Sequence, residues 1–77
     1  MTIGYVLINI APGKEKELFE TMQEWGEIQE LYPLFGDYDI IAKIEIADYE
    51  LLSQIVLNKI RILDGITDTK TLPVAKF

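Results

Sequence analysis

Gly36-Asp37-Tyr38-Asp39 and the following Ile40-Ile41-Ala42-Lys43-Ile44-Glu45-Ile46 form the middle of this 77-residue chain, a polar turn that leads into an apolar strand. Glycine and aspartate are typical of tight turns between antiparallel strands. The preceding residues, 28–35, are also rich in β-forming side chains, so the two stretches are predicted to pair as a hairpin. The remaining elements lie on either side of this hairpin in the sequence.

Each half of the chain supplies one further strand and one helix. Residues 3–10 are apolar at both odd and even positions, which is typical of a strand buried on both faces. Gly26 is predicted to end the first helix as a left-handed cap, and Asp48 to begin the second as its N-cap. The expected elements are a strand at 3–10, a helix at 14–25, strands at 28–35 and 38–46, a helix from Asp48 to about Leu63, and a strand at 66–74.

The order βαββαβ is that of the ferredoxin-like fold, an α+β class in which two helices cover one face of a four-stranded antiparallel sheet. Right-handed crossovers favour the strand order 4-1-3-2. Proline supports this order independently, because Pro33 and Pro73 lie in the two strands assigned to the edges, where a missing N–H donor is tolerated. The whole chain, 1–77, is therefore predicted to be a single domain.

Composition excludes several classes of function. The chain has no histidine and no cysteine, and so lacks the usual neutral-pH proton shuttle, metal ligand and thiolate. Its net charge is −6 with scattered lysines, whereas nucleic-acid binders usually present a basic face. No apolar run approaches the ~20 residues that span a bilayer, and no signal peptide is visible. We expect a cytoplasmic protein without cofactor or metal, without direct nucleic-acid or membrane binding, and without catalytic activity.

Two helices leave the other face of the sheet uncovered. Because the strand at 3–10 is apolar on both parities, either Val6, Ile8 and Ile10 or Tyr5 and Leu7 would meet water there, together with Ile41 and the threonines of the last strand. Exposed apolar surface of this kind usually marks an interface. A second copy packed sheet against sheet would cover it, so we predict a homodimer rather than an open one-sided sheet.

The turn is the best candidate for a small-ligand contact. The carboxylates of Asp37 and Asp39, with the N–H groups that Gly36 leaves free, could bind the amine and carboxylate of a zwitterion. The alternative is that Gly-Asp serves only as turn chemistry, and composition alone favours this alternative.

An ordered set of segments resembles the C-terminal effector domain of the Lrp/AsnC transcription regulators, also called RAM. The resemblance covers Ile3 to Val74. The segments that carry it are Pro12-Gly13-Lys14-Glu15, Gly36-Asp37-Tyr38-Asp39-Ile40-Ile41-Ala42-Lys43, Ile60-Arg61 and Gly65-Ile66-Thr67-Asp68-Thr69-Lys70-Thr71.

This resemblance implies an amino-acid-binding regulatory and oligomerisation module, without a helix-turn-helix of its own, whose dimers assemble into larger rings. It implies that amino acids bind in clefts between dimers, with Asp39 tied to the effector response. Pro73 makes the last strand less typical of the family. The ligand-binding residues that the resemblance implies are Gly36, Asp37, Tyr38, Asp39, Tyr49, Leu72 and Val74.

Two alternatives to this function remain. The chain could be a pure assembly subunit that partners full-length Lrp/AsnC regulators without binding an effector. It could also be an enzyme of the dimeric α+β barrel kind, which the absence of histidine and cysteine disfavours.

Overall fold

The structure, a computed structural model, describes residues 1–76. Its four strands form one antiparallel sheet in the order β2-β3-β1-β4, which confirms the predicted βαββαβ fold and strand order. The elements are β1 (Thr2–Ile10), α1 (Glu15–Gln23), β2 (Ile28–Pro33), β3 (Ile40–Ile46), α2 (Tyr49–Ile55), the π-helical turn η1 (Val56–Ile60) and β4 (Ile66–Pro73).

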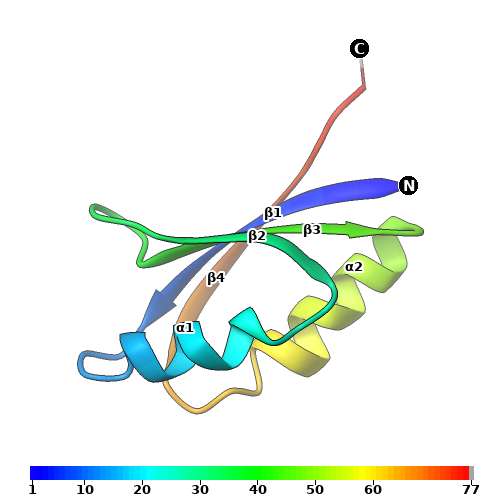
Figure 1. Cartoon of the computed structure of the whole chain (residues 1–77). Coiled ribbons are helices and arrows are strands. Elements are labelled where there is room, and N and C mark those ends of the chain that lie inside the picture. Colours follow the sequence, from blue (N-terminus) through cyan, green and yellow to red (C-terminus); the bar gives the residue numbers. More distant parts are fainter. Residues whose placement is uncertain (77) are drawn as a thin grey trace.

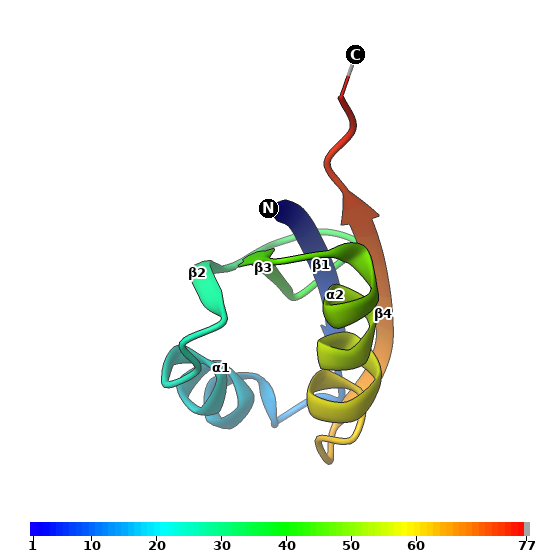
Figure 2. The same ribbon diagram turned by 90° about the vertical axis from the view of Figure 1, so that its right-hand side faces the viewer.

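Both helices lie on one face of the sheet (Figures 1 and 2). The even-numbered residues from Gly4 to Ile10 in β1 and from Ile40 to Ile44 in β3 point toward the helices and are buried, while their odd-numbered neighbours point the other way. This alternation follows from the two-residue period of a strand. The fully or nearly buried apolar core consists of Val6, Ile8, Ile10, Leu18, Met22, Ile40, Ala42, Ile44, Leu52, Val56 and Ile60.

The prolines lie where the sequence predicts them. Pro33 is the last residue of edge strand β2 and Pro73 the last residue of edge strand β4. The N-cap prediction is also confirmed, because the backbone N–H of Leu51 donates to Asp48 Oδ1 at 2.9 Å. Strands β2, β3 and β4 and helix α1 are shorter at one end or both than predicted, by up to two residues.

Two predictions about the helix ends are wrong. Among residues 1–76, positive φ occurs at Gly13, Gly36 and Gly65, so Gly26 is not a left-handed cap. The second helix does not continue as a regular α-helix, because η1 follows it with the Arg61 N–H donating to the Val56 carbonyl at 2.9 Å. That bond spans five residues and defines the wide π turn.

The threonines of β4 lie on the opposite face from the predicted one. Thr69 and Thr71 pair with Ile8 and Val6, whose side chains are buried beneath the helices. Residues directly opposite one another on paired strands share a face. The two threonines therefore face the helix layer, and Leu72, opposite Tyr5, lies on the uncovered face instead. No helix within residues 1–76 is long and apolar enough to cross a membrane.

Candidate functional site

The turn that joins β2 to β3 is tied to the end of β1. Gly36 has a φ of 108°, a conformation that glycine adopts at no steric cost. The Leu34 N–H donates to the Asp39 carbonyl at 2.8 Å, and the Asp39 N–H donates to the Ile8 carbonyl at 2.9 Å. These bonds fix the turn relative to the sheet.

The Asp39 carboxylate has a structural partner. Its Oδ2 accepts a hydrogen bond from the Ile10 backbone N–H at 2.8 Å, where the pairing of β1 with β4 becomes irregular. The side chain thus replaces a carbonyl that a longer β3 would have supplied. The second oxygen, Oδ1, is the one through which Asp39 could bind a ligand ammonium.

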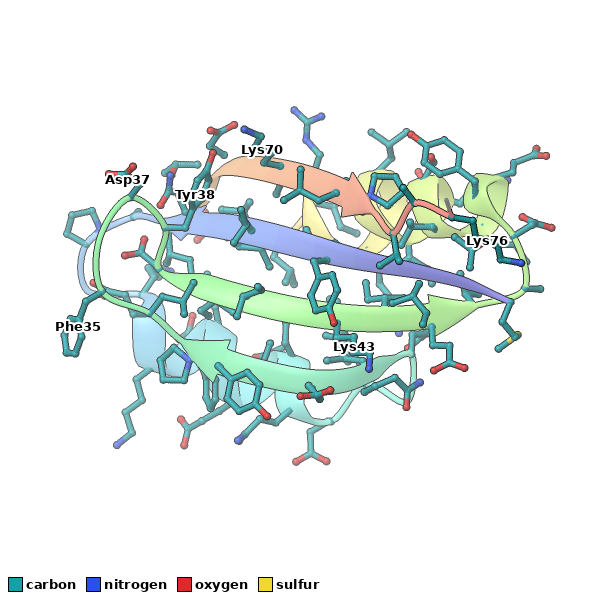
Figure 3. All side chains as sticks on the ribbon, turned by 90° about the horizontal axis from the view of Figure 1, so that it is seen from above. Phe35, Asp37, Tyr38, Lys43, Lys70 and Lys76 are labelled. Atoms are coloured by element: carbon teal, nitrogen blue, oxygen red, sulfur yellow. The ribbon has the colours of Figure 1, made fainter. Side chains whose placement is uncertain are left out.

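The other turn residues extend beyond the sheet. Asp37 is exposed and Tyr38 is half-buried, and both lie in the loop at one end of the sheet in Figure 3. Phe35 is fully exposed at this loop and was not predicted as a site residue. The apolar pair Leu34-Phe35 directly before Gly36 is the sequence signal for this exposed side chain, but its composition also fits a continuing strand, whereas β2 ends at Pro33.

Of the remaining predicted site residues, Tyr49 and Val74 lie toward the other end of the sheet, and Leu72 lies midway along it. β3 begins at the turn and runs to Ile46, next to the start of α2, where Tyr49 is 56% exposed. Seven residues of strand span about 20 Å. Leu72 is paired with Tyr5 and lies on the uncovered face, while the Val74 N–H donates to the Ile3 carbonyl at 2.8 Å. One copy of the chain therefore does not bring the two groups of predicted site residues together.

Tyr49 borders a groove between α2, η1 and β4 of about 230 Å³. Ser53, Arg61, Thr69 and Thr71 line the same groove, so it presents hydroxyls and the chain's one arginine. The sequence pattern predicts the threonines on the opposite face of the sheet, away from Tyr49, whereas the register of β4 with β1 places them beside it. Leu72 does not line the groove.

The uncovered face combines apolar side chains with a small polar network. Tyr32 donates to Glu30 Oε1 at 2.9 Å, and Lys43 Nζ donates to Glu30 Oε2 at 3.3 Å. The bond from Tyr32, and next that from Lys43, lowers the pKa of the Glu30 carboxyl, while Glu30 raises the pKa of both partners. Lys43 lies on the face turned toward the viewer in Figure 3. An apolar surface surrounds this network and is formed by the side chains of Ile3, Tyr5, Leu7, Ile41 and Leu72.

A second polar contact joins the start of β2 to η1. Lys59 Nζ donates to both oxygens of Glu27 at 2.9 Å, and it lies 4.6 Å from the centroid of the Trp25 ring. The bond from Lys59 is the main reason that the pKa of the Glu27 carboxyl lies below its usual value. Within residues 1–76 no three acidic side chains gather as a metal site.

Comparison with known proteins identifies the family. The family model of the Lrp/AsnC ligand-binding domain matches residues 3–76. The chain belongs to the Lrp/AsnC family. The resemblance noted from the sequence is thereby confirmed over nearly the whole chain.

Individual relatives agree with this assignment. The transcriptional regulator FL11 of Pyrococcus furiosus is 31% identical over 96% of this chain and 48% of its own length. The domain thus spans about half the length of the curated regulators it matches. TTHA0845 of Thermus thermophilus is 30% identical with a TM-score of 0.93, over all of this chain and 96% of its own.

A more distant structure shares the fold alone. The transcriptional regulator NMB0573 of Neisseria meningitidis, solved as a complex with L-Met, is 19% identical with a TM-score of 0.84, over 97% of this chain and 50% of its own.

Proposed function

We propose that this domain senses a free amino acid and assembles through its uncovered sheet face, as the effector part of a cytoplasmic transcription-regulation system. The observation that carries the proposal is the division of the candidate site. The turn at 36–39 lies at one end of the sheet, whereas Tyr49 and Val74 lie toward the other end and Leu72 lies between the two ends. A ligand that contacts both groups needs more than one copy of the chain.

The uncovered face fits a second copy. A two-fold interface places the same patch on both sides, so the patch must be complementary to itself. This face carries charges of both signs, Glu30, Lys43 and Lys70 among them, around the apolar side chains of Tyr5 and Leu7. In a self-paired arrangement, basic groups of one copy can lie opposite acidic groups of the other. Dimers formed in this way would then associate further through their ends.

The turn supplies the ligand groups in this proposal. Asp39 Oδ1 and the Asp37 carboxylate would accept from the ligand ammonium, and the N–H groups around Gly36 and Tyr38 would donate to its carboxylate. An amino acid is the ligand class to test first, since NMB0573, with the same fold, holds L-Met. Tyr49 and Val74 of another copy would complete the cleft, whereas Leu72, on the uncovered face, would be covered by the paired copy.

The decisive experiment measures mass by light scattering, and melting temperature, with and without a panel of amino acids at millimolar concentration. We expect at least one amino acid to change both quantities. Asp39→Asn should abolish the response, because it removes the charge while its amide carbonyl oxygen still accepts from the Ile10 N–H. Glu20→Gln, an exposed acid on α1, is the matched control and should respond like the wild type. A full panel without any response contradicts the amino-acid proposal.

A second candidate is an assembly subunit for longer regulators. The matched relatives named as regulators are about twice as long as the segment they share with this chain, so a mixed interface with them would reuse the same sheet face. Co-purification of such a regulator would support this candidate if, in addition, no amino acid in the panel changes the mass or the melting temperature. An enzymatic function gains no support from relatives named as transcription regulators.

A further inference from the structure

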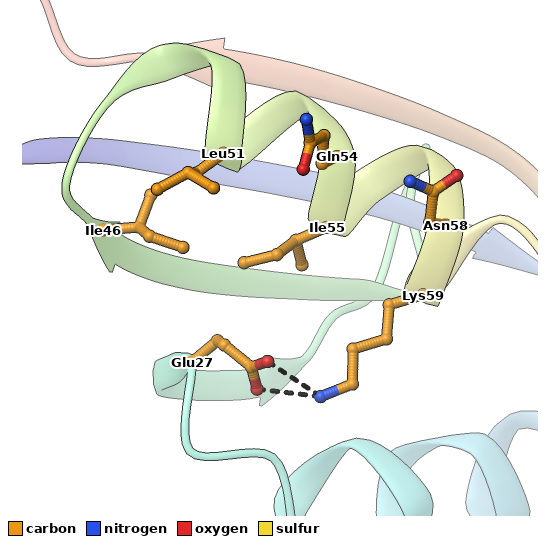
Figure 4. A pocket seen from close by; sticks show the side chains of 7 residues that line it. All are labelled: Glu27, Ile46, Leu51, Gln54, Ile55, Asn58 and Lys59. Carbon is orange, nitrogen blue, oxygen red and sulfur yellow. Dashed lines mark hydrogen bonds and ion pairs between the residues drawn. The ribbon is translucent and has the colours of Figure 1, made fainter.

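A groove on the helix side of the sheet has the features of a ligand site within a single copy. It lies between the start of β2, the end of β3 and the helical segment α2–η1 (Figure 4), and its volume is about 400 Å³. That volume is at the lower end of the roughly 300–1,000 Å³ typical of small-molecule pockets. Glu27 and Lys59 face each other at one side, and Ile46, Leu51 and Ile55 form an apolar surface beside them.

We infer that this groove binds an α-amino acid with an apolar side chain. The ligand carboxylate would pair with the Lys59 ammonium, and the ligand ammonium would pair with the Glu27 carboxylate. Binding opens one internal ion pair and forms two new ones. The side chain of the ligand would pack on Ile46, Leu51 and Ile55.

The Glu27–Lys59 pair is accessible enough to exchange partners. The Lys59 and Glu27 side chains are 40% and 34% exposed. Ion pairs at such positions typically contribute no more than about 1 kcal/mol to folding. Opening the pair therefore costs the fold little. Lys59 also keeps its contact with the Trp25 ring, at 4.6 Å, as an anchor while its carboxylate partner changes.

Lys59 lies in the wide turn that ends the second helix. Asn58 and Lys59 both lie in η1, and both line the groove. A wide turn of this kind is an ordinary way for a helix to end, so η1 bears on the site only through the positions that it gives these two side chains. The wide turn sets the directions in which these two side chains leave the helix. It also ends the regular hydrogen bonding of α2 next to the groove.

This site is separate from the one in the proposed function, although the ligand class is the same. Ile46 is at the end of β3, whereas the turn at 36–39 precedes its start. The groove is formed by one copy and needs no neighbour. Variants can therefore test the two sites independently.

The chain's one tryptophan provides the readout. Trp25 contacts Lys59, so a ligand that pairs with Lys59 should change the indole fluorescence. We expect a saturable change with L-leucine. Leucinamide lacks the carboxylate, 4-methylpentanoate lacks the ammonium and glycine lacks the apolar side chain, so each should bind about tenfold more weakly or worse. Equal binding of L-leucine and all three analogues would overturn the inference.

Variants at the ion pair give the second test. Glu27→Gln and Lys59→Gln should each weaken L-leucine binding about tenfold, since each removes a charged hydrogen-bond partner. Because Lys59→Gln also changes the surroundings of Trp25, the side-chain amide NMR signals of Gln54 and Asn58, which line the groove, serve as an independent readout. Circular dichroism establishes that the variants fold. Glu20→Gln and Lys16→Gln, exposed charges on α1, should bind like the wild type.

The outcomes separate this inference from the proposed function. If Asp39→Asn loses the change in mass but keeps the Trp25 and amide responses, the groove is supported on its own. If amino acids change the mass of the wild type while Trp25 and the Gln54 and Asn58 amides stay unchanged, the groove inference is overturned and the proposed function stands. Unaltered binding in both Glu27→Gln and Lys59→Gln would likewise overturn it.

Discussion

Of the glycines in the chain, Gly4 is the one at which the sheet packs most closely against the second helix. A Cβ atom at this position would lie 2.5 Å from Leu52 Cδ2 and 3.1 Å from Cδ1. Leu52 is fully buried in the core, so its side chain has little space into which to move. The close packing of α2 on β1 therefore depends on the absence of a side chain at Gly4.

We predict that Gly4→Ala lowers the free energy of unfolding by about 1–3 kcal/mol, the usual cost of overpacking a core. Urea denaturation measures the change. Gly26→Ala is the matched control, because a Cβ there would meet no atom within 4 Å and Gly26 does not have a positive φ. Equal stability of the two variants would show that Leu52 and α2 shift freely.

Asp39 illustrates what a sequence can and cannot predict about one residue. The order Gly36-Asp37-Tyr38-Asp39 before an apolar strand is enough to nominate it as a ligand group. The hydrogen bond between its Oδ2 and the Ile10 N–H depends on which strand lies next to β3 and in which register, so the local sequence does not contain it. A role in the fold and a role in binding can coexist because the carboxylate has two oxygens.

At the scale of elements, the sequence predicted the order of strands and helices because period and turn chemistry are local. The positions of the prolines predicted which strands lie at the edges of the sheet, because the effect of proline on strand pairing is also local. The face of β4 was not predictable in this way, since alternating Thr69, Lys70 and Thr71 are polar on both parities and the register with β1 decides. η1 also left no local signal, because a π turn inserts a residue without changing the helical composition. The separation of the turn from Tyr49 and Val74 follows from the antiparallel topology, which the local sequence does not contain.

The contact between Glu27 and Lys59 joins the turn directly before β2 to η1 and makes this connection sensitive to pH. Since Lys59 lowers the pKa of Glu27 in the folded state, the pair stabilises the fold above the unfolded carboxyl value near 4.5. This stabilisation is lost as the pH falls through the lower, folded-state pKa. Because the pair is partly exposed, its contribution is at most about 1 kcal/mol.

We predict that Glu27→Gln is less stable than the wild type at pH 7 and that the difference is smaller at pH 3, because the stabilisation from the ion pair decreases as the pH falls below the unfolded carboxyl value near 4.5. Urea denaturation at the two pH values measures the difference. Glu20→Gln, which is exposed on α1, should show little difference at either pH. An equal loss of stability at pH 7 and pH 3 would mean that Glu27 acts through packing and not through its charge.

At the scale of the whole molecule, the two faces of the sheet differ in what covers them. The helix face completes a core within one chain, and residues such as Ile8 and Ile44 are fully buried there. The other face carries Tyr5, Leu7 and Ile41 with no element of residues 1–76 above them (Figures 1 and 2). A small domain with one covered face is marginal on its own. Assembly through the second face would then add stability as well as form the cleft between copies.

The last prediction tests this division with one side chain. Leu7 lies on the uncovered face opposite Ile41 on one side and Lys70 on the other. In Leu7→Glu, the new carboxylate can pair with Lys70 in a single copy and stay hydrated, so we expect the domain to fold. In a sheet-to-sheet dimer the same carboxylate would lose its water, which is strongly unfavourable. Light scattering should therefore show the mass of a single chain, 8.8 kDa, in place of the larger wild-type mass.

Leu57→Glu is the control, because Leu57 is 54% exposed in η1 on the helix side and its change leaves the uncovered face unaltered. We expect this variant to keep the wild-type mass. If Leu7→Glu keeps that mass as well, the copies associate through a surface that neither of these two side chains touches. A loss of mass in Leu7→Glu alone would assign assembly to the sheet, since the two variants add the same charge to the same residue type.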